Sequence, residues 1–146
     1  MPEPQQALRP RIIYLLNYLN MIVRRRLDER LRTHDLGGLQ YTILSLVRDR
    51  EGISSAELSR RFFVTPQTMN ETVAGLERRG LIIRFESAAN RRILEAHVTE
   101  AGRTLLQTCD HIADEVEHDA FGALPEADRH RLHALLSERF HALRAR

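Results

Sequence analysis

The hydrophobic positions along the chain change their period twice, and these changes divide it into three parts. Between residues 10 and 33 they recur every three or four positions, which predicts one long amphipathic helix. Gly37-Gly38 interrupts the pattern, and a second helix is expected from Leu39 to Val47, ending near Arg50. The stripe of the first helix consists of Ile12, Leu15, Leu16, Leu19, Ile22, Val23, Leu27 and Leu31.

Two short helices joined by a tight turn are expected next. Ser54 is a typical N-cap, and Glu57 three positions later completes the pattern of a capping box ahead of a helix from Ser55 to Arg61. Thr65-Pro66 begins a further helix, because threonine is a good N-cap and proline favours the first helical position. That helix ends at Gly80. The arrangement predicts a helix-turn-helix.

After Gly80 the period becomes two, which predicts a β-hairpin. In its first strand Leu81, Ile83 and Phe85 alternate with Ile82, Arg84 and Glu86. The return strand places Leu94, Ala96 and Val98 on one side. The tip, Ser87 to Arg92, is small, polar and basic, so the hairpin is interpreted as a wing.

From Thr99 the helical period returns, and Pro125 opens a last helix. We therefore expect a mainly α fold with a small β-wing: a winged helix-turn-helix with N- and C-terminal dimerisation helices, forming a single domain over residues 1–146. The segments 10–33 and 100–146 have broad apolar faces, which the unit of about 60 residues between them, 36–99, is too small to cover. A two-fold dimer that packs both ends of each chain together is the economical solution.

Charge and composition narrow the class of protein. The net charge is only +2, but arginines outnumber acids by 9 to 6 in residues 1–54 and by 7 to 5 in 55–99, whereas acids prevail by 9 to 6 in 100–146. The first two thirds therefore suit a polyanion better than the last third. One cysteine excludes a disulfide framework. No apolar run has membrane-spanning length, and residues 1–10 show no secretion signal, so we expect a cytoplasmic protein without membrane contact.

Several motifs together are similar to those of the MarR family of bacterial regulators. They are Ser55–Arg61, Val64–Met69, Leu76–Ile82, Asn90–Arg92 and Val98–Arg103. Their order and spacing match over roughly residues 36–106, and the closing Thr-Glu-Ala-Gly-Arg after a basic wing is the most diagnostic. The resemblance implies a homodimer whose recognition helices enter consecutive major grooves of double-stranded DNA while the wings reach flanking minor grooves. It also implies a small-molecule or oxidant signal, and family habit favours a repressor.

The recognition helix and the wing supply the expected DNA contacts. With Met69, Val73 and Leu76 turned inward, the remaining face of the helix is left for DNA. Arg92 falls at the family's wing-arginine position, beside Asn90, where the family often has an aspartate. Arg60, Arg61 and Arg84 are weaker candidates for backbone contact. The expected DNA-binding set is Thr65, Pro66, Gln67, Thr68, Asn70, Glu71, Arg78, Asn90, Arg91 and Arg92.

Other residues could bind or sense a signal: a small aromatic effector, an oxidant or zinc. Tyr14, Tyr18 and Tyr41 lie where the family forms an effector pocket, and they suit a small aromatic ligand as well as plain helix packing. Cys109 lies on an apolar seam with Leu105, Ile112 and Val116, so packing is favoured over oxidant sensing. A zinc site is conceivable at His111 and His118, which share a helix face with Asp114, but a solvated or dimer-facing stripe is favoured.

Two functions compete with DNA binding. The sequence lacks a G-x-S-x-G elbow, an H-E-x-x-H helix and a phosphate-binding glycine loop, so we expect no enzyme, no catalytic residue, no metal and no cofactor. A winged helix can also act as a protein–protein module that never touches DNA. The paired arginines of the wing tip favour the DNA-binding regulator.

Overall fold

The computed structural model describes residues 10–145 as mainly helical, with one small three-stranded sheet, so the expected fold class is confirmed. Residues 1–9, where no secretion signal is expected, and Arg146 lie outside the described residues. The elements are α1 (Ile12–Leu31), the 3-10 helix η1 (Arg32–His34), α2 (Gly38–Asp49), β1 (Ile53–Ser54), α3 (Ser55–Phe62), α4 (Pro66–Arg78), β2 (Ile82–Glu86), β3 (Leu94–Val98), α5 (Glu100–Phe121) and α6 (Glu126–Arg144).

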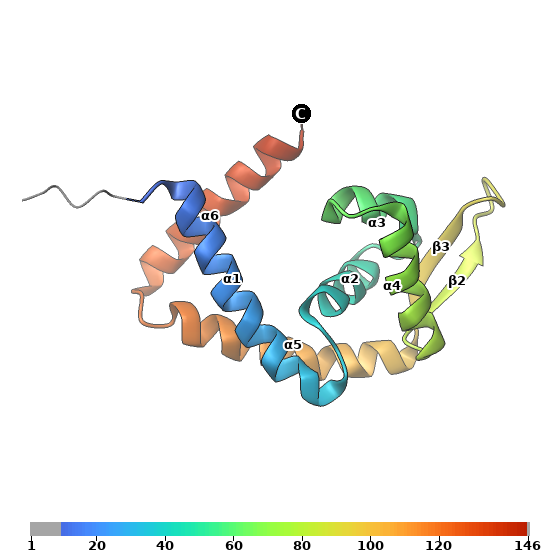
Figure 1. Cartoon of the computed structure of the whole chain (residues 1–146), viewed down its shortest axis with the longest axis horizontal. Helices are drawn as coiled ribbons and strands as arrows, with labels where there is room; N and C mark the ends of the chain where they lie inside the picture. The colour runs from blue at the N-terminus through green and yellow to red at the C-terminus, as the bar shows by residue number, and fades with distance from the viewer. Residues whose placement is uncertain (1–9, 146) are drawn as a thin grey trace, which may run out of the picture.

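The long helix α5 connects two regions of the molecule (Figure 1). At its N-terminal end lies a lobe made of α2, α3, α4 and the β2–β3 hairpin. At its other end the chain turns back into α6, while α1 crosses α5 between the two regions. Within residues 10–145, none of the helices combines the length and the apolar character that crossing a bilayer requires.

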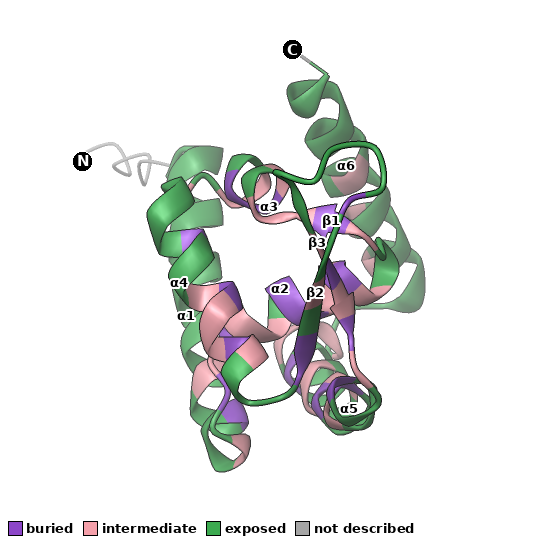
Figure 2. Ribbon diagram, turned by 90° about the vertical axis from the view of Figure 1, so that its right-hand side faces the viewer, coloured by how far each residue is buried: buried purple, intermediate pink, exposed green. Residues whose placement is uncertain are grey.

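The hydrophobic core lies in the lobe. α2 contributes Ile43 and Leu44, and α4 contributes Met69, Val73 and Leu76, all essentially inaccessible to solvent. The inward face expected for α4 is therefore confirmed. By contrast α6 has no buried residue and α1 has only Leu31, so these two helices are largely exposed in Figure 2. The isolated chain leaves the terminal helices uncovered.

Side-chain caps fix the start of both helices of the helix-turn-helix. Ser54 Oγ accepts a hydrogen bond from the N–H of Glu57 at 3.2 Å, and Thr65 Oγ1 accepts one from the N–H of Thr68 at 3.1 Å. The capping box at Ser54 is only half formed, because the Glu57 carboxylate bonds the guanidinium of Arg61 at 3.0 Å instead. An i,i+4 arginine competes for the glutamate that the sequence pattern assigns to the helix start.

The sheet has the order β1-β3-β2, with both pairs antiparallel and Ile82 opposite Val98 at the base of the hairpin. β1 was not expected from the sequence. In β2 the buried residue is Ile82, whereas Ile83 and Phe85 are exposed, so the set that faces the lobe is the one containing Ile82 and Arg84. Packing against α4 thus turns the more polar of the two sets toward the lobe, whereas the alternation alone favours Ile83 and Phe85 as the inward residues.

The motif Val98–Arg103 joins the hairpin to α5. Thr99 is the N-cap: its Oγ1 accepts from the N–H of Gly102 at 3.1 Å and donates to the carbonyl of Gly80 at 2.5 Å. A Cβ on Gly102 would lie 2.3 Å from the carbonyl oxygen of Leu81, so the close approach requires glycine. The start of α5 is thereby fixed to the base of the wing.

Candidate nucleic-acid interface

The outward face of α4 is polar and accessible. Because Met69, Val73 and Leu76 are buried, the helical step turns the expected contact residues away from the core. The side chains of the helix start and of this face are all exposed: Thr65, Pro66, Gln67, Thr68, Asn70, Glu71 and Arg78. The sequence-predicted set on α4 therefore lies on one accessible surface.

Two local hydrogen bonds order this face. The hydroxyl of Thr65 donates to Thr68 Oγ1 at 2.9 Å while it caps the helix, so it is engaged within the first turn. Gln67 Nε2 donates to Glu71 Oε1 at 3.1 Å, one helical turn further on. The second amide hydrogen and the Oε1 atom of Gln67 are left for a partner, and this is the pattern that matches an adenine edge.

A cleft of about 450 Å³ connects the recognition helix to the wing. Its walls include Pro66 and Asn70 of α4, Arg60 of α3 and Arg92 of the wing tip. Cationic and amide side chains from three elements thus meet around one hollow. Such a surface suits a polyanionic backbone with base edges beside it.

Asn90 orders the wing tip through the backbone. Its Oδ1 accepts from the N–H of Arg92 at 3.1 Å, and its carbonyl accepts from the N–H of Ile93 at 2.9 Å. The asparagine therefore shapes the turn that presents Arg92 without contributing a charge. Arg91 is 89% exposed, with its Nε 3.9 Å from Glu86. Ser87, expected at the exposed tip, is instead buried, and its Oγ accepts from the N–H of Ala89 at 3.3 Å.

The weaker arginine candidates separate into two kinds. Arg84 bonds Glu77 of α4 at 2.7 Å and its side chain is only 16% exposed, while Arg61 bonds Glu57 and is 15% exposed. Both are therefore internal ties of the lobe rather than free cations. Arg60, in contrast, is exposed; both Arg60 and Arg84 line the cleft.

The three tyrosines are not brought together. Tyr41 is half-buried, and its hydroxyl donates to Asp110 Oδ1 at 2.8 Å, while Arg48 donates to the other oxygen of Asp110 at 2.6 Å. Burial, and then the bond to Asp110, raises the pKa of Tyr41 to about 12. Tyr14 and Tyr18 are exposed on α1. Tyr41 thus ties α2 to α5, which is the packing role that the sequence left open.

A groove of about 260 Å³ lies between α1 and the lobe. Arg24 and Val23 of α1 line one side, and Leu39 and Thr42 of α2, with Phe62 of α3, line the other. It joins apolar walls to one cation, a combination that suits a small amphipathic anion.

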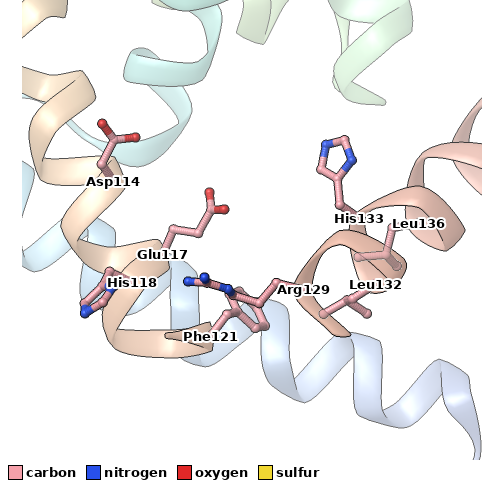
Figure 3. Close-up of a pocket in the computed structure, with 8 residues that line it drawn as sticks. All are labelled: Asp114, Glu117, His118, Phe121, Arg129, Leu132, His133 and Leu136. Carbon is pink, nitrogen blue, oxygen red and sulfur yellow. The ribbon is translucent and has the colours of Figure 1, made fainter. Parts of the chain in front are cut away.

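A second groove, of about 370 Å³, lies between the end of α5 and α6 (Figure 3). Asp114 and His118 line it, and Arg129 extends from α6 toward Glu117 and Phe121. His111, grouped with them in the sequence, is not among its lining residues. Within residues 10–145 no cluster of three or more histidine, cysteine, aspartate or glutamate side chains is arranged to hold a metal ion.

Cys109 is completely buried in the core. Burial, reinforced by the nearby charge of Asp110, raises the pKa of its thiol. A neutral thiol without solvent contact reacts slowly with oxidants. The buried position of Cys109 agrees with the packing role that the sequence favours for it.

One residue with a structural link to this surface was missed in the sequence. Arg79, at the end of α4, bonds the backbone of the turn between α1 and α2. The sequence does not distinguish Arg79 from Arg78, because either of two adjacent arginines near a helix C-terminus can be an ordinary exposed cation.

Comparison with known proteins agrees with this architecture. The MarR family model matches residues 34–93. The HTH-type transcriptional repressor Rv2887 of Mycobacterium tuberculosis is 32% identical over 99 residues, which cover 68% of this chain and 71% of that protein. The crystal structure of Rv2887 with p-aminosalicylic acid superimposes with a TM-score of 0.75 and 26% identity, covering 88% of this chain and 98% of that chain. The Staphylococcus aureus MepR–DNA complex shares the fold, with a TM-score of 0.77 and 21% identity over 92% of this chain and 99% of that one. The chain belongs to the MarR family of winged helix-turn-helix transcriptional regulators.

Proposed function

We propose that this chain is a homodimeric repressor that binds a pseudo-palindromic site in double-stranded DNA. The observation that carries the proposal is the single cleft in which Asn70 of the recognition helix and Arg92 of the wing meet. A helix with an exposed polar face enters a major groove, and an arginine-tipped wing fits the narrow, electronegative minor groove beside it.

The residues of this surface divide between base and backbone contacts. Gln67 and Asn70 carry amides that bond an adenine edge in two places, whereas Arg78 serves the phosphate backbone. At the first turn of α4, Pro66 has no N–H and the N–H of Thr68 is held by the Thr65 cap, so the N–H of Gln67 and the positive end of the helix dipole are what this turn offers to phosphate. Arg91 and Arg92 enter the minor groove, with Asn90 shaping the turn that carries them. Glu71 acts through Gln67, to which it is bonded.

The terminal helices supply the dimer interface. α1 exposes a run of large apolar side chains, and α6 exposes Leu135, Leu136, Phe140 and Leu143. Exposed apolar surface on this scale marks an interface rather than a solvated face. We assign residues 10–33 and 100–146 to the dimerisation arm and 36–99 to the DNA-binding lobe. The exposed set on α1 is Ile12, Ile13, Tyr14, Leu15, Leu16, Tyr18, Leu19, Met21 and Ile22.

The relatives support repression and ligand control. Rv2887 is named a transcriptional repressor, it is crystallised with p-aminosalicylic acid, and MepR is crystallised with DNA. For this chain we propose an effector site for a small aromatic acid in the groove between α1 and α2. Arg24 offers the cation and Phe62 an aromatic wall. Tyr14 and Tyr18 do not line this groove, because the 100° helical step places them on the side of α1 opposite its groove-lining residues, so both are left out of the proposed site. The hydroxyl of Tyr41 is engaged by Asp110.

Selection from a random duplex library tests the function. The purified protein is expected to enrich a pseudo-palindrome whose half-sites lie about one helical turn apart, roughly 34 Å. A charge-matched variant that replaces both Gln67 and Asn70 by alanine is the control, and it should enrich no defined sequence. Failure of the unaltered protein to enrich any sequence would contradict the proposal and favour a protein–protein role.

A further inference from the structure

Arg79 connects the end of the recognition helix to the base of α1. Its guanidinium donates to the carbonyl oxygen of Asp35 at 2.6 Å and to that of His34 at 3.1 Å. His34 is the last residue of η1, which continues α1, and Asp35 follows it with a left-handed φ of 52°. One side chain thus holds two consecutive carbonyls at the end of the α1–η1 segment.

The chemistry at both ends of this contact suits an arginine. The last carbonyls of a helix have no partner within the helix and carry the negative end of its dipole. A guanidinium presents several N–H groups in one rigid plane, so it bonds two adjacent acceptors at once, which an ammonium does less well. Arg79 is itself the C-cap of α4, immediately before the left-handed Gly80. Its backbone position is therefore fixed by the end of the recognition helix.

The other polar links of α1 go elsewhere. Asp28 accepts from the N–H of Gly38 at the start of α2, and Arg30 bonds Glu115 and Asp119 of α5. Within residues 10–145, no other hydrogen bond or ion pair joins α4 to α1 or η1. Arg79 is consequently the polar contact that holds the end of the recognition helix against the end of η1, which directly continues the arm helix α1.

We propose that Arg79 is a positioning residue that fixes the angle of the recognition helix against the dimerisation arm, and thereby the half-site spacing that the dimer accepts. The inference rests on the proposed function, because spacing has meaning only for a dimer that reads two half-sites. The two recognition helices of a dimer are related through their arms, so an error in the helix-to-arm angle is repeated at both half-sites.

Spacing is a stringent readout of this angle. One inserted base pair moves the second half-site by about 3.4 Å along the axis and rotates it by about 35° around it, since a turn holds 10–10.5 base pairs. A firmly held helix cannot follow that displacement, whereas a helix released from the arm can. Loss of a DNA contact would instead lower affinity equally at every spacing.

The experiment measures the dissociation constant for a series of operators, derived from the selected site, with one or two base pairs added or removed between the half-sites. The wild-type protein is expected to lose on the order of tenfold in affinity for a change of one base pair, and Arg79→Ala at most about threefold. Arg78→Ala is the matched control: it removes the adjacent arginine, weakens binding at all spacings and keeps the wild-type profile.

Arg79→Lys covers the case in which the alanine variant does not fold, as judged by its melting temperature. The lysine keeps the charge but not the planar fork, so an intermediate profile is expected. A sharp wild-type optimum that Arg79→Lys and any folded Arg79→Ala retain unchanged would overturn the inference alone. A wild-type protein without any spacing optimum would overturn the proposed dimeric operator binding, and this inference with it.

Discussion

Arg84 on the first strand of the wing bonds Glu77 on the recognition helix, with Nη2 2.7 Å and Nε 3.1 Å from the same carboxylate oxygen. The bond spans the turn at Gly80 and links the two elements that the proposed function places in neighbouring grooves. It lowers the pKa of Glu77, mainly through the hydrogen bond from Arg84. Helix and wing are therefore held together as one unit.

Replacing Glu77 by glutamine is expected to destabilise the fold in a pH-dependent way. Because the folded-state pKa lies below the ordinary value of 4.5, the contribution of the charged bond is complete above that value and is lost as the pH falls through the lowered pKa. For a partly exposed pair the loss at pH 7 should be about 0.5–1 kcal/mol. Thermal unfolding across the pH range measures it. Glu117→Gln, on an exposed residue of α5, is the control, and equal curves for the two variants at pH 7 would contradict the assignment.

Removing Arg92 is expected to weaken DNA binding and to flatten its salt dependence. The slope of log K against log salt is negative, and one fewer phosphate or groove contact reduces its magnitude by about 0.9. Titrations of Arg92→Ala between low and near-physiological salt give this slope. Arg131→Ala, which removes the same charge from the exposed face of α6, should leave the slope at the wild-type value. An unaltered slope for Arg92→Ala would remove this residue from the contact surface.

The local architecture was predictable where the signal is local. Thr65-Pro66 and Ser54 start their helices as expected, because N-caps act within one turn. The buried face of α4 followed from its period, and the wing followed from the change of period after Gly80. The family resemblance rests on the same local motifs, so it is visible in the sequence without any tertiary contact.

What escaped prediction depends on contacts between distant elements. β1 has only two residues, too few to show a period, and it exists because β3 offers Ala96 and Glu95 as partners. The inward side of β2 is selected by α4 and not by the strand itself. Arg79 and Arg84 look like surface charges in the sequence, and their roles come from acceptors far along the chain or across a turn.

An acidic residue in the middle of the exposed face of α1 should dissociate the dimer. Leu16→Asp places a charge where we propose that two copies bury apolar surface, so the molar mass in solution should halve at micromolar concentration. Light scattering after gel filtration measures it. Phe85→Asp is the matched control: Phe85 is 54% exposed but lies on β2 of the wing, outside the arm. If Leu16→Asp stayed dimeric, the assignment of α1 to the interface would be wrong.

Cys109 should be inert in the folded protein. Its buried thiol has a raised pKa, so the neutral form is favoured and its contribution to stability is lost only as the pH rises above the ordinary value of 9.0. A thiol-specific chromogenic reagent at pH 8 is expected to react on the timescale of unfolding, and at once in denaturant. Hydrogen peroxide should leave DNA affinity unchanged. Rapid reaction of the native protein would revive the oxidant-sensing hypothesis.

The central claim is that this chain reads a defined DNA sequence as a dimer, and a quantitative titration tests it most directly. The selected operator and a scrambled duplex of the same composition are each titrated with purified protein at near-physiological salt, and the bound stoichiometry is recorded. We expect the operator to bind two protomers with an affinity about a thousandfold or more above that of the scrambled duplex. Equal affinity for the two duplexes, or saturation with a single protomer, would contradict the account.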